Sequence, residues 1–514
     1  MGMLSAPHGR RRAALAVALA VGVLLLGILA RPTPPTLATT VIGDPALAAR
    51  VRPLLTGARD RVSVIVVDGD AVTYAHFGAN ADTEYELGSI AKTFTAALLA
   101  DAIARGEVRA DTPLGALLPL AGSPVAEVTL VELASHRAGL PRLATRPQDI
   151  ASTAARALGH KDPYTEDLAT LLAQARAATL HERGQTAYSN LGVALLGQAL
   201  AAASGLAYPE LVRERLLLPL GLTATSVPVT AANLPPGAPT GYSATGYPEA
   251  PWTLNAYAPA GGVRSTPADM ARYARALLAG TAPGADALTP RWAYGPRQIG
   301  YAWLTETDNG RTVTWHDGET GGFTSMIALD RAAGRAVIIL SDTGAPVADA
   351  ALALLTGGGL MGRRSLLVLA VLLGTTAHFA LGAWRARGIG SSRDRWSLFG
   401  GVATACTALV LGALLVDWAT VPGVVWLVAV GLVAVGVGGA AWRWATLPWS
   451  AANARWRATH WPRQRPGARR LAARPGPRLM LDSGAKPRRD KTRQDFLALR
   501  HVGPELENMR PGAK

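Results

Sequence analysis

A serine and a lysine lie three residues apart in the segment ELGSIAK, which occupies positions 86–92. Apolar residues at helical spacing follow, and Gly106 comes after them, so a helix is predicted to begin near Ser89 and to carry Lys92 one turn along the same face. A serine hydroxyl is a weak nucleophile without a base, and a lysine amine can be that base when burial or a nearby cation lowers its pKa. Backbone N–H groups at a helix start can stabilise the oxyanion of an acyl transfer. The pair predicts nucleophilic attack by Ser89 with Lys92 as base.

The choice of lysine at position 92 supports this interpretation. Residues 31–360 contain 23 arginines but only two lysines, Lys92 and Lys161. Arginine supplies a positive charge but does not lose its proton in proteins, whereas lysine can. The Ser-x-x-Lys spacing alone has little specificity, since a second copy, Ser483 to Lys486, lies in a proline-rich and arginine-rich segment. We interpret that copy as coincidental.

Tyr188 and Asn190 form a second candidate group, directly before the Leu/Ala-rich stretch Asn190–Ser204. A phenol near a lysine ammonium can have its pKa lowered and can exchange protons with the serine or the leaving group. An asparagine amide can orient the lysine or hold a substrate carbonyl. Taken alone, however, the triplet fits a half-buried tyrosine and a helix-capping asparagine better.

A third candidate group, His316-Asp317-Gly318, lies between predicted strands and is followed by Glu319. The His-x-Gly pattern alone has little specificity, because His501-Val502-Gly503 also matches it near the C-terminus. Its position is more informative: a histidine bounded by glycine at a strand edge leaves room for a substrate backbone alongside.

Composition excludes several classes of protein. The single cysteine, Cys406, rules out a disulfide within one chain and a cysteine-rich metal site, and the histidines lack metal-ligand spacing, so neither a metal nor a cofactor is expected. The net charge is +15, but residues 31–360 hold 25 basic and 29 acidic residues. Nucleic acid is therefore not an expected partner, since the part that should fold is slightly acidic.

The central region, roughly Asp44 to Leu355, is predicted to be one α+β domain. A β-hairpin is predicted at 62–67 and 71–75, with a Gly-containing turn at 68–70. Further strands are predicted at 312–315, 324–329 and 336–340, with a turn at 331–334, and helices at Asn190–Ser204 and Pro267–Ala279. Strands at both ends of a helical middle predict a sheet assembled from distant parts of the sequence.

Four apolar runs predict membrane spans. The first, 13–30, has eighteen residues, about 27 Å as a helix, and ends without a small-x-small site, which favours an uncleaved anchor over a signal peptide within residues 1–30. The others are 366–384, 398–416 and 424–441. Arginines crowd the connection after the second run and follow the fourth, whereas residues 417–423 have none. By the positive-inside rule we expect a multi-pass cell-membrane protein with both termini in the cytoplasm and residues 31–364 outside.

The C-terminal segment 451–514 has 16 basic and five acidic residues together with seven prolines. This composition predicts a disordered cytoplasmic tail. Attraction to anionic lipid headgroups is the favoured role, which makes the bilayer an expected partner, and regulatory docking is the alternative.

These motifs resemble the serine β-lactamase and penicillin-binding-protein superfamily, in its branch of class C β-lactamase-like serine hydrolases and esterases. Ser-x-x-Lys, Tyr-x-Asn and Lys/His-x-Gly occur in family order at Ser89/Lys92, Tyr188/Asn190 and His316/Gly318. Segments 133–141, 218–222 and 260–266 are further landmarks, and the resemblance covers about residues 44–355.

The resemblance implies a β-lactamase/transpeptidase-like fold: a five-stranded antiparallel sheet flanked by helices plus a helical subdomain, here followed by transmembrane helices. It implies that Ser89 is acylated, that Lys92 is its base, that Tyr188 carries protons and that Asn190 positions substrate. The backbone N–H groups of Ser89 and Glu319 would form the oxyanion hole, beside His316 and Gly318.

His316 departs from the β-lactamase pattern, which has lysine there. A neutral imidazole attracts a β-lactam carboxylate less than a fixed cation does, and the family uses His-x-Gly in esterases and D-amino-acid peptidases. We therefore expect a membrane-anchored serine hydrolase that forms an acyl-enzyme with an ester or a D-amino-acid-containing peptide outside the cytoplasm. The alternatives are a β-lactamase, a penicillin-binding receptor or sensor that is acylated without rapid turnover, and a non-catalytic scaffold. The sequence does not indicate an oligomeric state.

Overall fold

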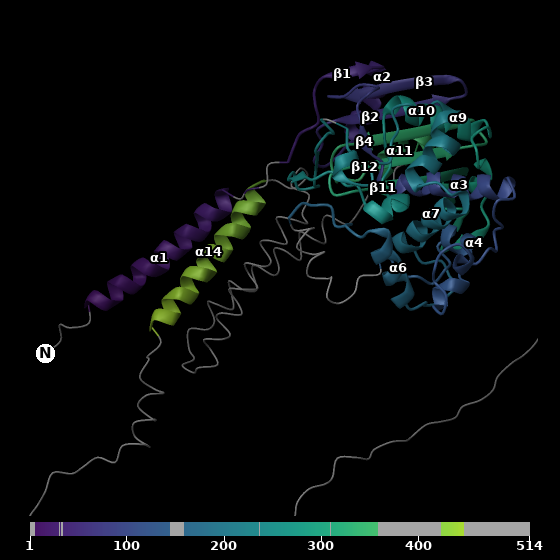
Figure 1. Ribbon diagram of the computed structural model, residues 1–514. Coiled ribbons are helices and arrows are strands. Elements are labelled where there is room, and N and C mark those ends of the chain that lie inside the picture. The colour runs from purple at the N-terminus through teal and green to yellow at the C-terminus, as the bar shows by residue number, and fades with distance from the viewer. Residues whose placement is uncertain are drawn as a thin grey trace, which may run out of the picture. The chain divides into compact units, whose positions relative to one another are not determined.

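The computed structural model describes residues 6–29, 31, 34–143, 159–235, 237–308, 310–357 and 423–446 (Figure 1). Residues 41–357 contain the sheet and the helices that pack on it, while α1 (Ala6–Leu29) and α14 (Gly423–Thr446) are separate apolar helices. The predicted spans 366–384 and 398–416 and the predicted tail 451–514 lie outside the described residues.

The central sheet joins the two predicted strand-rich regions. β2 (Val62–Asp68) and β3 (Ala71–Phe77) form the predicted hairpin, and β11 (Arg311–Glu319), β12 (Thr324–Asp330) and β13 (Arg335–Ser341) form the second antiparallel group. β13 pairs antiparallel with β2, with Arg335 opposite Asp68 and Ser341 opposite Val62. The predicted assembly of the sheet from distant sequence is confirmed.

The expected number of strands, five, is wrong: within the described residues the sheet has nine, in the order β1-β3-β2-β13-β12-β11-β10-β9-β8. The additional strands lie at the two edges: β1 (Val41–Gly43), β10 (Leu304–Asp308), β9 (Arg297–Ile299) and β8 (Trp292–Tyr294). Three of these four have only three residues, too few to display the alternation by which a strand is read from sequence.

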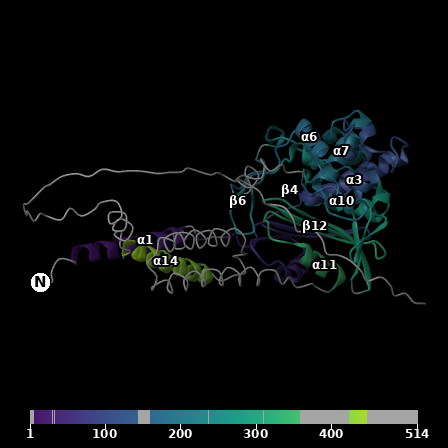
Figure 2. The same ribbon diagram turned by 90° about the horizontal axis from the view of Figure 1, so that it is seen from below.

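Apolar cores cover both faces of the sheet. Val64 and Ile65 are adjacent in β2 but belong to different cores, because successive strand side chains point to opposite faces. α2 (Pro45–Val51) and α11 (Ala348–Thr356) cover one face, and α10 (Pro267–Leu278) packs on the other (Figure 2). The large core beside α10 also includes α3 (Ala91–Ala104), α4 (Leu130–Ala134), α6 (Leu168–Ala177) and α7 (Asn190–Ser204). This is the expected α+β fold with helices on both faces and a helical subdomain.

Local capping explains the boundaries of the two helices that the sequence predicts best. The Ser189 side chain accepts a hydrogen bond from the Gly192 N–H at the start of α7, and the helix ends at Gly205 with φ +71°. The Thr266 side chain caps α10 in the same way. The shorter elements are α8 (Tyr208–Val212), α9 (Leu218–Leu220), β4 (Tyr85–Glu86), β5 (Gly241–Tyr242), β6 (Pro248–Glu249), β7 (Arg264–Ser265) and the 3-10 turn η2 (Gly88–Ile90).

α1 and α14 pack against each other in antiparallel directions, with Gly27 against Val430 and Gly438 against Ala16 and Ala20. Within the described residues, no single helix meets the length and hydropathy needed to cross a membrane. The apolar helical segments Ala14–Leu29 and Leu427–Gly438 are too short, and the bent pair Asn190–Ser204 with Tyr208–Leu220 passes by length and composition alone. α7, the first helix of that pair, is largely buried in the domain core.

Candidate active site

The turn before α3 places a serine beside a buried lysine. Ser89 lies in η2, and Lys92 follows in the first turn of α3. The Lys92 Nζ atom lies 2.9 Å from Ser89 Oγ and also donates a hydrogen bond to the carbonyl oxygen of Ala260. The Lys92 side chain has 0% exposure. A lysine without contact with water is thus in direct contact with a serine hydroxyl.

The surroundings of Lys92 favour the uncharged amine. Burial lowers the pKa of Lys92 well below its ordinary value, and the positive charge of Arg142 lowers it further, while Asp317 opposes both. No carboxylate pairs with Nζ among the described residues. A buried ammonium without a counter-ion is costly, so the amine is set up to accept a proton.

Tyr188 completes the contacts of the serine. Its hydroxyl donates a hydrogen bond of 2.8 Å to Ser89 Oγ, and Lys92 Nζ lies 5.0 Å from the centre of its ring. Burial raises the pKa of Tyr188 above its ordinary value. The expectation that a nearby lysine ammonium would lower this pKa is therefore wrong, because desolvation dominates and the amine favours its uncharged form. Tyr188 remains a phenol that donates to the serine.

His136 is a neighbour of Tyr188 that the sequence analysis noted only as part of a landmark segment. Its ring centre lies 4.5 Å from that of Tyr188, and its Nδ1 accepts a hydrogen bond of 3.2 Å from the Ser189 N–H. The residue has φ +57°, and burial lowers its pKa well below the ordinary value. The neutral imidazole of His136 therefore packs against the ring of Tyr188.

Asn190 has one bonded and one unbonded side-chain atom. Its Nδ2 donates a hydrogen bond of 3.0 Å to the Tyr164 hydroxyl, whereas its buried Oδ1 has no hydrogen-bond partner among the described residues. Of the two roles considered for this amide, the structure shows no hydrogen bond to Lys92 and places Asn190 on the wall of the pocket. The unbonded Oδ1 can accept a hydrogen bond from a ligand.

The backbone of strand β11 lies close to the backbone of η2, the turn that carries Ser89 and is called the serine turn below. An added Cβ at Gly318 would lie 2.0 Å from the Leu87 carbonyl oxygen, and one at Gly88, which has φ +50°, would lie 2.5 Å from the backbone nitrogen of Glu319. Only glycine permits both approaches. The amide of Glu319 is thereby brought next to the backbone that carries Ser89, which is the arrangement that an oxyanion hole of these two N–H groups requires.

His316 and Gly318 lie inside β11, not between strands as expected, because the strand continues through Glu319 to pair with β12. Neither lines the pocket. The His316 ring donates from Nδ1 to the Asp317 carbonyl oxygen at 2.6 Å. Burial lowers the pKa of His316 to about 4, although the negative charge of Asp317 opposes this shift. His316 is therefore a neutral, buried neighbour of the lysine.

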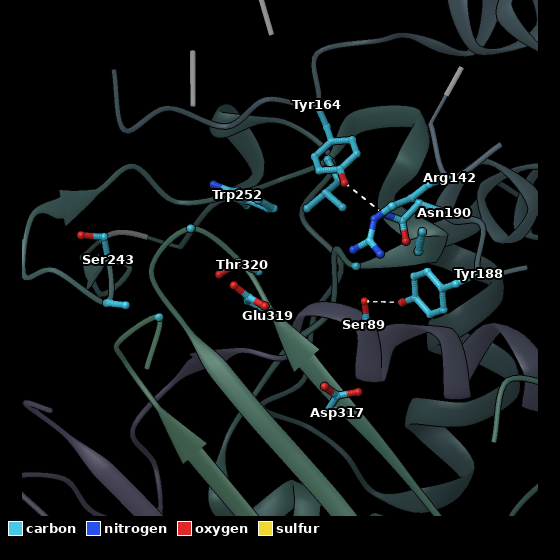
Figure 3. A pocket seen from close by; sticks show the side chains of 16 residues that line it. Ser89, Arg142, Tyr164, Tyr188, Asn190, Ser243, Trp252, Asp317, Glu319 and Thr320 are labelled. Atoms are coloured by element: carbon cyan, nitrogen blue, oxygen red, sulfur yellow. Dashed lines mark hydrogen bonds between the residues drawn. The ribbon is translucent and has the colours of Figure 1, made fainter. Parts of the chain in front are cut away.

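A pocket of about 560 Å³ opens over Ser89 (Figure 3). Tyr164 and Trp252 form an aromatic corner, with ring centres 5.6 Å apart. The Asp162 carboxylate ties both segments together by accepting the backbone N–H groups of Tyr164, Thr253 and Leu254. The lining residues are Ser89, Arg142, Tyr164, Tyr188, Asn190, Ser243, Ala244, Trp252, Leu254, Ala260, Gly261, Asp317, Glu319, Thr320, Gly321 and Gly344.

Arg142, Tyr164 and Trp252 line the pocket but belong to none of the sequence motifs. Backbone hydrogen bonds from Asn190 and Leu191 to the Arg142 carbonyl oxygen hold the arginine at the start of α7, and its guanidinium lies 5.1 Å from the Tyr188 ring centre. These contacts join loops far apart in sequence, so no local pattern indicates them. In the described part of the chain, no cluster of three or more His, Cys, Asp or Glu side chains could hold a metal ion.

Comparison with known proteins shows the family of this chain. The beta-lactamase family model matches residues 47–356. The D-alanyl-D-alanine-carboxypeptidase/endopeptidase AmpH of Escherichia coli K12 is 30% identical over 236 residues, which are 42% of this chain and 57% of that protein, so the chain matches little more than half of this relative. A beta-lactamase of Pseudomonas fluorescens is 26% identical over 56% of this chain and 90% of its own length.

The fold is also shared with solved structures. The crystal structure of a beta-lactamase/D-alanine carboxypeptidase from Pseudomonas syringae superposes with a TM-score of 0.51 and 20% identity, covering 59% of this chain and 95% of that one. The family model spans more than half of the sequence and includes the serine, lysine and tyrosine that meet at the pocket. The chain belongs to the beta-lactamase family.

Proposed function

We propose that this protein is a serine hydrolase that works through an acyl-enzyme on an ester or a D-amino-acid-containing peptide. The observation that carries the proposal is the contact of a fully buried lysine amine with the Ser89 hydroxyl. Since this amine forms no ion pair with a described residue, it is suited to take the proton of its neighbour.

The geometry assigns a step to each group. Ser89 Oγ attacks the substrate carbonyl carbon while its proton moves to Lys92 Nζ, 2.9 Å away. The backbone N–H groups of Ser89 and Glu319 bind the developing oxyanion, a contribution of about 10²- to 10³-fold per donor. Tyr188, which donates to Oγ, relays a proton to the leaving group and is reprotonated from Lys92. Water then attacks the acyl carbon and gives a proton to this pair, the Oγ–carbon bond breaks, and the pair returns the proton to Ser89 Oγ.

The choice of substrate class rests on His316 and on the relatives. A histidine with a pKa of about 4 is uncharged near neutral pH, so it offers no fixed cation to a β-lactam carboxylate. One relative is named as a D-alanyl-D-alanine carboxypeptidase and endopeptidase, and others as beta-lactamases, so both activities belong in the assay.

The test is turnover by the full chain of p-nitrophenyl acetate and of a D-alanyl-D-alanine peptide. We expect multiple turnovers that Ser89→Ala abolishes. A stoichiometric burst without further turnover would instead favour the acylated receptor. Equal rates for the wild type and Ser89→Ala would overturn the hydrolase proposal.

We further propose that the chain is anchored in the cell membrane, with the domain outside the cytoplasm and the basic tail inside. Support comes from the apolar composition of α1 and α14 and from the distribution of arginines around the apolar runs. Fusion of alkaline phosphatase at position 357 and at position 514 tests this topology. We expect activity from the first fusion alone, and the reverse pattern would contradict the proposal.

A further inference from the structure

A buried ion pair joins the two short strands that lead into the active site. Glu86 of β4 and Arg264 of β7 lie directly opposite each other in an antiparallel pair, and the Leu87 N–H continues this pairing with a hydrogen bond of 2.9 Å to the Val263 carbonyl oxygen. Arg264 Nη1 donates a hydrogen bond of 2.7 Å to Glu86 Oε1, and its Nε donates one of 2.6 Å to Glu84. The side chain of Arg264 has 0% exposure and that of Glu86 has 3%. Neither residue lines the pocket.

Each of these strands is continuous with a group that contacts the catalytic lysine. Ser89 comes three residues after Glu86, and Ala260 comes four residues before Arg264. Lys92 Nζ is hydrogen-bonded to Ser89 Oγ and to the Ala260 carbonyl oxygen. A shift of β7 relative to β4 would therefore move the Ala260 acceptor away from Nζ and leave the amine free to turn away from the serine.

The Glu86 carboxylate also contacts two further walls of the site. Its Oε1 accepts a hydrogen bond of 2.9 Å from the Trp252 N–H, which belongs to the aromatic corner of the pocket. The hydroxyl of Thr320 lowers the pKa of the same carboxylate. Thr320 directly follows Glu319, whose backbone N–H is assigned to the oxyanion hole. One buried carboxylate thus connects the serine turn to three other segments of the site.

The energetics of the pair favour a geometric role over a stabilising one. Burial raises the pKa of Glu86, and the positive charge of Arg264 only partly compensates. The desolvation of two buried charges largely offsets their attraction, so such a pair adds little net stability. Arg264 Nη2 is also buried without a hydrogen-bond partner among the described residues, which costs further free energy. Charge-assisted hydrogen bonds do, however, fix the groups that they join in a defined geometry.

We propose that Glu86 and Arg264 are positioning residues for the acyl transfer. Their ion pair holds the segments that carry Ser89 and Ala260 at the separation at which Lys92 can bond to both. The inference rests on the proposed hydrolase function. Because neither residue lines the pocket, loss of the pair should lower kcat and leave KM nearly unchanged.

The test compares Arg264→Met with the double variant Glu86→Gln/Arg264→Met in the full chain, with p-nitrophenyl acetate as substrate and at a temperature well below the lowest Tm. Arg264→Met leaves a buried carboxylate without this arginine, so its Tm should fall. The double variant buries no charge at either position, so its Tm should recover. We expect kcat to be about 10²-fold below that of the wild type in both, the usual cost of a small misplacement of catalytic groups.

The rate at which a fluorophosphonate labels Ser89 gives a second readout that does not require turnover, and it should fall together with kcat. Arg264→Lys keeps the charge but not the planar fork of donors, so its kcat and labelling rate should lie between those of the wild type and Arg264→Met. This variant provides the same comparison in a folded protein if Arg264→Met does not fold.

The matched control is Asp330→Asn. Asp330 is a buried carboxylate that pairs with Arg311 at the end of β11 away from the serine turn, so this variant should lower Tm without changing kcat.

Recovery of kcat together with Tm in the double variant would show that the pair acts through stability alone. That result would overturn the inference and leave the hydrolase proposal intact, as would a rise in KM with kcat retained, or wild-type rates in folded Arg264→Met or Arg264→Lys. Absence of any Ser89-dependent reaction in the wild type would defeat the hydrolase proposal itself.

Discussion

Lys92 Nζ lies 2.9 Å from Ser89 Oγ while the lysine side chain is fully buried. The short distance lets the lysine amine take the proton of the serine hydroxyl, and burial favours the uncharged form of that amine. Neither feature alone would make Lys92 a base. An exposed lysine stays protonated near neutral pH, and a neutral lysine far from the serine cannot accept the serine proton. Their combination in one residue explains why lysine, rare in this arginine-rich domain, occupies position 92.

The first prediction concerns Lys92→Arg. The variant keeps a positive charge but cannot lose its proton, so kcat/KM for p-nitrophenyl acetate should fall by about 10²- to 10⁴-fold, the usual contribution of a general base. Lys161→Arg, at an exposed position outside the pocket, is the matched control and should keep full activity. Comparable rates for the two variants would show that position 92 is not the base.

The second prediction concerns Tyr188→Phe. The substitution removes the hydroxyl that donates to Ser89 Oγ but keeps the ring that packs on His136. We expect kcat to fall by about 10²- to 10⁴-fold, with a small change in Tm. Tyr247→Phe, where the ring stacks on His160 away from the serine, should behave like the wild type. A large loss of Tm with little loss of kcat would assign Tyr188 a structural role.

The third prediction concerns the approach of β11 to the serine turn. Gly318→Ala should displace the strand, because its Cβ would lie 2.0 Å from the Leu87 carbonyl oxygen. Activity should be lost together with a fall in Tm, since overpacking of this kind costs about 1–3 kcal/mol. Gly436→Ala in α14, where an added Cβ meets nothing within 4 Å, is the control. An active and equally stable Gly318→Ala would contradict the described contact.

The fourth prediction concerns stability in acid. In the unfolded chain His316 binds a proton below its ordinary pKa of 6.5, whereas burial lowers its pKa in the folded domain to about 4. The unfolded state therefore binds more protons between these values, and the free energy of unfolding falls as the pH falls from 6.5 to 4. The contribution of this residue approaches about 3 kcal/mol at pH 4.

Denaturant unfolding followed by tryptophan fluorescence at several pH values measures this effect. His316→Gln should show a shallower decline of stability over the same range. An unchanged slope in the variant would show that the histidine is not held neutral in the fold.

The long elements could be predicted from sequence because their patterns are strong. β2, β3, β12 and β13 are runs of β-branched and apolar residues, and α7 and α10 have caps that mark their starts. The three-residue edge strands and the continuation of β11 from residue 316 to residue 319 could not, since pairing with a neighbour, and not local pattern, decides them.

The candidate active site, like the fold, could be predicted from the sequence only in part. Ser89, Lys92 and Tyr188 were predicted from motifs, and the structure brings them together. The direction of the Tyr188 pKa shift was not predicted correctly, because burial is a property of the folded domain. Arg142 and Trp252 reach the pocket through loop contacts that no spacing in the sequence indicates.

Labelling of the intact protein by a fluorophosphonate tests whether an uncharged Lys92 activates Ser89. We expect a single covalent adduct on Ser89, found by mass spectrometry, which forms rapidly at pH 7 in the wild type and very slowly in Lys92→Arg. Labelling of another residue, or equally fast labelling of Ser89 in that variant, would contradict it.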